Sequence, residues 1–205
     1  MTQQAAPSTA GGSDSDILLR LRTESRAEHE AIERELDLMA PGLTRARYVV
    51  RLERFYGFYA PLEARLEARG AFPGSESGPQ PKTPLLVADL RALGAGPPDQ
   101  LPLCAALPPL TSPAEVLGCL YVLEGASLGG QVISRHLRRT LGISRENGGR
   151  FFAGYGEATG AHWRAFSASL VAFAREHGQQ DLLVRSAILT FRAMRSFCRE
   201  GAAHV

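Results

Sequence analysis

One histidine, His29, stands on the apolar face of a predicted helix, where its imidazole could do chemistry. The apolar residues that share this face at helical spacing are Leu18, Leu21, Ile32 and Leu36. A neutral imidazole at this position could bind a metal ion, and Glu33, one turn further on, could accept the other ring N–H. A histidine on an apolar face is also found as a hydrogen-bonded core residue. The residue types alone allow both interpretations.

Three glycines, Gly125, Gly129 and Gly130, interrupt a strongly helical segment near the middle of the chain. Each glycine in a helix costs about 1 kcal/mol relative to alanine. Gly125 and Gly129 are four residues apart and share one helix face, where a flat and bulky ligand could approach the backbone. Close packing of two helices explains small residues equally well. A phosphate-binding loop is excluded because no strand precedes the glycines and no Gly-Lys-Ser/Thr follows them.

The apolar periodicity along the rest of the chain predicts an all-α protein. We expect one disordered tail over 1–13 and one helical domain over 14–205. A first helix is predicted from 14–16 to Pro41, and a second from 44 to 69 with a kink or division at Pro61. The remaining helices are predicted at 85–93, 112–142, 157–177 and 180–199. The start at Ser112 is the clearest, because Glu115 completes a capping box.

Composition excludes several classes of protein. A formal net charge of +2 and the absence of a basic run with interleaved aromatics argue against nucleic-acid binding. No secretory signal or membrane-length apolar stretch is evident, so we expect a cytoplasmic protein without a membrane partner. The three cysteines, Cys104, Cys119 and Cys198, lie far apart without metal or disulfide spacing. Lys82 is the only lysine, among arginines that carry the rest of the positive charge.

Two segments together resemble the motifs of haem oxygenases. The segment TESRAEHEAIE, residues 23–33, resembles the first-helix motif of that family, and YVLEGASLGGQVISRHL, residues 121–137, resembles its distal-helix motif. The sequence of the second segment is most similar to bacterial members that make biliverdin, including those that accompany bacteriophytochromes. The resemblance implies a multihelical single domain. Haem would lie between a proximal first helix and a kinked, glycine-rich distal helix.

The resemblance also implies roles for residues outside the distal helix. His29 would be the proximal ligand of the haem iron. Arg22, two turns before it, matches a basic position that meets a haem propionate in relatives. Phe191 would line the haem pocket, although a core aromatic is an equally good interpretation of that residue.

On the distal side, the resemblance implies that Gly125, Gly129 and Gly130 contact haem and form the catalytic face. Ser127 lies between these glycines and would offer a catalytic hydroxyl. Many members of the family carry an aspartate directly after the first distal glycine, where it organises waters. This chain has Ala126 there, which puts oxygen activation in more doubt than haem binding.

The function implied is oxidative cleavage of haem b by O2 and an external electron donor to biliverdin, CO and Fe2+. Ferredoxin or a flavin reductase would supply the electrons, and a bacteriophytochrome could receive the biliverdin. Two alternatives stay open at this level. One is a non-catalytic haem carrier or sensor of the same fold, and the other is a helical interaction protein that binds no haem.

Overall fold

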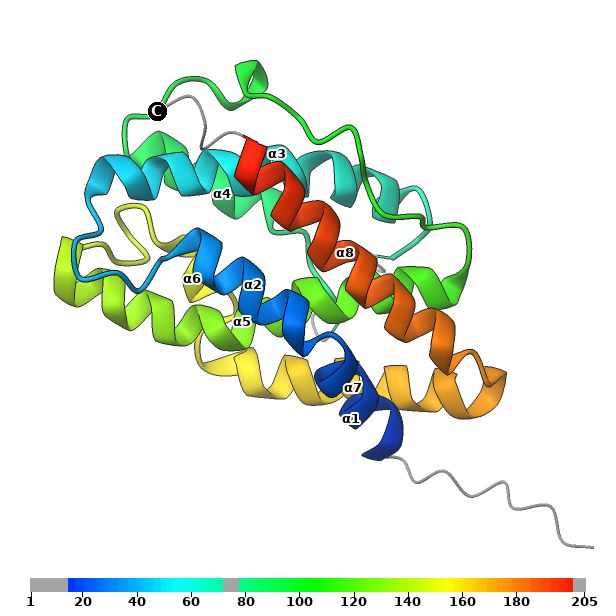
Figure 1. Cartoon of the computed structure of the whole chain (residues 1–205). Helices are drawn as coiled ribbons and strands as arrows, with labels where there is room; N and C mark the ends of the chain where they lie inside the picture. Colours follow the sequence, from blue (N-terminus) through cyan, green and yellow to red (C-terminus); the bar gives the residue numbers. More distant parts are fainter. Residues whose placement is uncertain (1–14, 72–77, 201–205) are drawn as a thin grey trace, which may run out of the picture.

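The computed structural model describes residues 15–71 and 78–200 (Figure 1). The described elements are all helical: α1 (Ser15–Glu24), α2 (Arg26–Leu36), α3 (Arg45–Glu67), α4 (Thr83–Ala92), η1 (Pro98–Gln100), α5 (Pro113–Leu141), α6 (Arg150–Ala153), η2 (Gly156–Ala158), α7 (Thr159–His177) and α8 (Gln180–Glu200). The predicted all-α fold is therefore confirmed. The tail predicted over 1–13 lies outside the described residues.

The core is organised around α8, which packs against α5, α2, α1 and α3. The closest approach of α5 and α8 is at Gly118, where an added Cβ would lie 2.3 Å from the carbonyl oxygen of Leu183. Ser186 Oγ donates a 2.6 Å hydrogen bond to the carbonyl oxygen of Glu115 at the same crossing. A side chain at Gly118 is excluded because the two helix backbones nearly touch.

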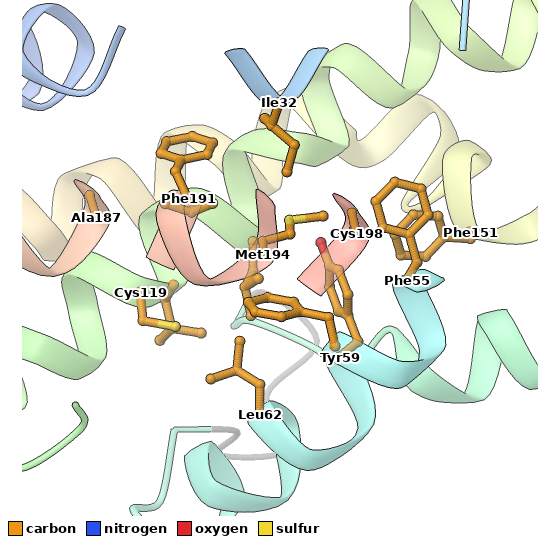
Figure 2. Close-up of a cluster of buried hydrophobic side chains, with 14 of the residues drawn as sticks. Ile32, Phe55, Tyr59, Leu62, Cys119, Phe151, Ala187, Phe191, Met194 and Cys198 are labelled. Carbon is orange, nitrogen blue, oxygen red and sulfur yellow. The ribbon is translucent and has the colours of Figure 1, made fainter. Parts of the chain in front are cut away.

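Buried apolar side chains from α2, α3, α5, α6 and α8 meet beside this crossing (Figure 2). Ile32 enters the cluster from α2, Tyr59 from α3, Cys119 from α5 and Met194 from α8. Phe151 belongs to α6 and stacks edge-on against Tyr59, with ring centroids 5.3 Å apart. This cluster joins α2 to the rest of the core.

The predicted first helix is divided into α1 and α2 at Ser25. The buried Ser25 hydroxyl donates a 2.6 Å hydrogen bond to the carbonyl oxygen of Leu21. A hydroxyl that bonds back to the preceding turn in this way bends a helix. The backbone bond from His29 N–H to the Ser25 carbonyl is kept at 3.0 Å, so α2 starts directly after the bend. A single straight helix was expected here, and that expectation was wrong.

Helix α3 runs through Pro61 without the division that we predicted. Proline has no N–H, so the carbonyl oxygen of Gly57 loses its helical partner. The N–H of Cys104 donates to that oxygen at 2.9 Å. The proline thus frees a carbonyl that anchors the long connection between α4 and α5, and the helix continues.

Helix α5 is one 29-residue helix that continues through its glycines, as the predicted helix over 112–142 required. The capping box is confirmed: Ser112 Oγ accepts from Glu115 N–H at 3.3 Å, and Glu115 Oε2 accepts from Ser112 N–H at 3.1 Å. Contrary to the sequence expectation, α5 is long and apolar enough to cross a bilayer by length and composition. It packs against α8, α6 and α7 as a core helix does.

The close approach at Gly57 leads to a first prediction. An added Cβ there would lie 2.3 Å from the carbonyl oxygen of Pro102 and 2.7 Å from the Phe197 ring. We expect Gly57→Ala to lower the free energy of unfolding by about 1–3 kcal/mol, the usual cost of overpacking. Urea unfolding followed by circular dichroism measures this. Gly42→Ala is the control, because nothing lies within 4 Å of its Cβ position. Equal stability of Gly57→Ala and wild type would contradict the predicted clash.

Candidate functional site

His29 lies in the first half of α2, with its side chain 51% exposed. Its Nε2 is 3.4 Å from Glu33 Oε1, one turn further along the same helix. Imidazole has two ring nitrogens, so one can bond to this carboxylate while the other stays available to a metal. The partner that we predicted for His29 is therefore in place.

Salt bridges hold α2 on α8 around this histidine. Arg192 Nε lies 2.7 Å from Glu28 Oε1, and Arg195 Nε lies 2.9 Å from Glu35 Oε2. Arg195 also reaches Glu28, at 3.6 Å. The carboxylates on either side of His29 thus fix the helix that carries it.

Phe191 lies on α8 and is buried, with its ring centroid 5.4 Å from that of His29. Figure 2 shows it in the same apolar cluster as Ala187 and Met194. Phe191 is a core aromatic that also contacts the imidazole, and its place in a haem pocket stays a prediction. A packed ring beside His29 restricts how the imidazole can turn.

The second part of the site is an open face of α5. At Gly129 nothing lies within 4 Å of the Cβ position, and at Gly125 only the Trp163 ring comes near, at 3.6 Å. Leu128 and Val132 are 40% and 49% exposed on the same side of the helix. This open face, Gly125, Leu128, Gly129 and Val132, is an apolar surface where a ligand can reach the helix backbone.

Gly130 and Ser127 lie away from the open face. An added Cβ at Gly130 would meet the carbonyl oxygen of Phe152 at 2.6 Å, so this glycine serves helix packing. The buried carboxylate of Asp89 holds that neighbour in place, accepting from Phe151 N–H at 2.8 Å. Ser127 is buried, and its Oγ accepts from Lys82 Nζ at 3.0 Å. The structure does not bring these two predicted catalytic residues to the open face.

Arg22 lies on α1 and interacts electrostatically with a residue of α5. It is exposed, and its charge acts on the phenol of Tyr121, one turn before Gly125 on α5. Burial raises the pKa of Tyr121, and the positive charge of Arg22 partly offsets this rise. Tyr121 packs against Trp163 with ring centroids 5.7 Å apart. The role of Arg22 as a propionate partner stays a prediction.

These features fit haem. Among the described residues, no three His, Cys, Asp or Glu side chains converge as a metal site. An iron held in a porphyrin needs only one or two ligands from the protein, and His29 could provide one of them. The open face gives a flat apolar ring access to backbone that side chains would otherwise cover. A separate cavity of about 600 Å³ lies at the start of α5, between Arg69, Leu117 and Phe166, and none of its lining residues belongs to α2.

Comparisons with known proteins agree with this geometry. The family model described as heme oxygenase matches residues 100–200. A curated "Heme oxygenase" from Xanthomonas campestris pv. campestris (strain 8004) is 48% identical over 59 residues, which are 28% of this chain and 32% of that protein. The C-terminal part of the chain is therefore similar to haem oxygenases. The matched segment spans about a third of the curated relative.

Two solved structures share the fold. The NO- and CO-bound heme oxygenase from Neisseria meningitidis is 21% identical with a TM-score of 0.74, covering 92% of this chain and 93% of that one. The heme oxygenase from Leptospira interrogans is 19% identical with a TM-score of 0.72, covering 90% and 98%. The multihelical single-domain fold that the two motifs implied is thus confirmed.

Sequence analysis missed three residues that shape the site. Tyr121 and Trp163 border Gly125, and Lys82 lies behind Ser127. Lys82 was noticeable only as the one lysine of the chain. No spacing rule connects it to Ser127, 45 residues away.

The contrast between neighbouring glycines can be tested without any ligand. We expect Gly129→Ala to raise the free energy of unfolding by up to about 1 kcal/mol, because alanine favours helix and the position is open. Gly130→Ala should lower it by about 1–3 kcal/mol, because the new methyl meets the Phe152 carbonyl. Urea unfolding of the ligand-free variants measures both. A loss of stability in Gly129→Ala would show that the face is closed.

Proposed function

We propose that this chain cleaves haem b, using O2 and external electrons, to biliverdin, CO and Fe2+. The observations that carry the proposal are an exposed imidazole, His29 on α2, and an open glycine face on α5. The similarity to haem oxygenases supports the same reaction. Bound haem supplies the iron-centred oxygen chemistry, and its own ring is the carbon skeleton that is oxidised.

The residues of the chain bind and orient. His29 would hold the iron through one ring nitrogen, while Glu33 accepts the other N–H and strengthens donation to the metal. Phe191 restricts rotation of the imidazole. Arg22, exposed near Tyr121, would bind a propionate. Gly125 and Gly129 would let the ring lie against α5, so that the helix backbone fixes which edge faces bound oxygen.

Protons must reach the open face without a side-chain acid on it. The family's usual aspartate position is Ala126, which is exposed, and Glu124 is buried against Tyr155 instead. Gly129 leaves backbone uncovered, and water can enter there. We propose that water held by backbone groups at this face donates the protons.

Electrons would come from an acidic protein such as ferredoxin, or from a flavin reductase. The last turns of α5, directly after the open face, carry three exposed arginines: Arg135, Arg138 and Arg139. Such a basic surface attracts an acidic donor, and we expect electron transfer to slow as salt shortens the Debye length from about 10 Å at 0.1 M to about 3 Å at 1 M. Stopped-flow reduction by ferredoxin measures this dependence. A rate that does not change with salt would contradict the electrostatic docking.

The biliverdin would serve a tetrapyrrole-binding photoreceptor, a bacteriophytochrome. This part of the proposal rests on the similarity of residues 121–137 to phytochrome-associated members. Transfer of product to an apo-phytochrome, followed by its red absorption, tests it.

The function is tested with one equivalent of hemin. We expect a sharp Soret band that decays, after ascorbate and catalase are added in air, into the broad red absorption of biliverdin. His29→Ala should lose the normal Soret band, because no other side chain described on α2 can replace the imidazole. Glu33→Gln is the matched control: it keeps the ligand and weakens only its orientation, so hemin should still bind.

Two outcomes would contradict the proposal. A Soret band that is stable under reduction would identify a non-catalytic haem carrier or sensor. An unchanged spectrum in His29→Ala would show that another residue binds the iron.

A further inference from the structure

A buried charged cluster lies on the side of α5 opposite the open face. Its centre is Lys82, which directly precedes α4 and is itself only 4% exposed. The Nζ atom lies 3.0 Å from Ser127 Oγ, 3.4 Å from Glu124 Oε1 and 3.9 Å from the centre of the Tyr155 ring. All three contacts of the ammonium thus end on α5 or on the loop after α6.

Each neighbour of Lys82 is held by a further bond. Tyr155 OH donates to Glu124 Oε2 at 2.9 Å, and its phenol pKa is raised by burial. The Glu63 carboxylate on α3 accepts from the backbone N–H groups of Lys82 and Thr83, at 2.6 and 2.9 Å. Burial lowers the pKa of Lys82 itself, and Glu124 and Glu63 oppose that effect. The cluster therefore joins α3, α4, α5 and the turn before α7.

The position of this cluster on α5 gives it a consequence for the site. Ser127 is two residues from both Gly125 and Gly129, which places it about 200° around the helix from each. Glu124 and Ser127 are buried, while Ala126 and Gly129 are exposed. This turn of α5 contains glycines, which weaken a helix. Neighbouring side chains cannot support it on the open face if a ligand is to lie on that face. Support has to come from the other side.

We propose that Lys82 is a positioning residue, whose ammonium holds Glu124 and Ser127 and thereby fixes the Gly125–Gly129 turn of α5 over the ligand. A compact ammonium with three donors suits two oxygen acceptors and an aromatic face in a closed space, where a planar guanidinium is bulkier. The other positively charged side chains of the sequence are arginines, and its single lysine stands at this closed position. The inference deepens the proposed function and rests on it for the identity of the ligand.

The main experiment is hydrogen exchange of the ligand-free protein. In Lys82→Met, we expect the amides of residues 124–131 to exchange about tenfold faster than in wild type, because a buried charged hydrogen bond is lost. The amides of residues 113–120 on the same helix should be unchanged, which separates local loosening from global unfolding. Arg91→Met is the control, since it removes an exposed cation at the other end of the same helix, α4.

Ser127→Ala is a second variant in case Lys82→Met does not fold. Alanine has the higher helix propensity, so propensity alone predicts slower exchange over residues 124–131. The positioning role predicts the opposite, faster exchange, because Nζ loses an acceptor. Unchanged or slower exchange in Ser127→Ala, or unchanged exchange in a folded Lys82→Met, would overturn the proposal.

A loaded-protein measurement links the turn to the ligand. With hemin reduced under CO, the infrared C–O stretch of wild type should be a single narrow band, and that of Ser127→Ala should broaden as the distal turn samples several positions. An equally narrow band in the variant would overturn the link. If wild type binds no hemin, the proposed function fails, while the exchange result still decides the role of Lys82.

Discussion

Helix α5 must bury one side against neighbouring backbones and leave another side uncovered. Gly118 allows α8 to approach one end, and Gly130 allows the Phe152 carbonyl to approach the other. Between these two contacts, Gly129 stands free. Small residues along one helix thus serve two opposite purposes. The other helices, including α2 where it packs on α8, must leave the uncovered side of α5 free.

The sequence predicted the features that depend on local patterns. The capping box at Ser112 specifies the start of α5 because its bonds join residues three apart. His29 and Glu33 are one turn apart on a helix, so their contact followed from spacing alone. The all-α class followed from periodicity along every long segment. In each of these cases, residues close together in the sequence determine the geometry.

Other expectations failed where tertiary contacts decide. The division of α3 allowed for at Pro61 does not occur, and the Cys104 N–H satisfies the carbonyl that proline frees. The three distal glycines looked alike, and only the position of Phe152 distinguishes Gly130 from Gly129. Ser127 seemed to belong with its glycine neighbours, whereas Lys82 draws it inward from 45 residues away. No local pattern contains such information.

The burial of Lys82 has a chemical consequence beyond its contacts. It is the only side-chain amine in the sequence, and 4% of it is exposed. Amine-directed reagents therefore find no accessible lysine while the helices are packed. Acylation at this position requires Lys82 to leave its contacts with Ser127, Glu124 and Tyr155, so the reaction reports local opening of the structure. A mass shift on one peptide would time that event without any introduced label.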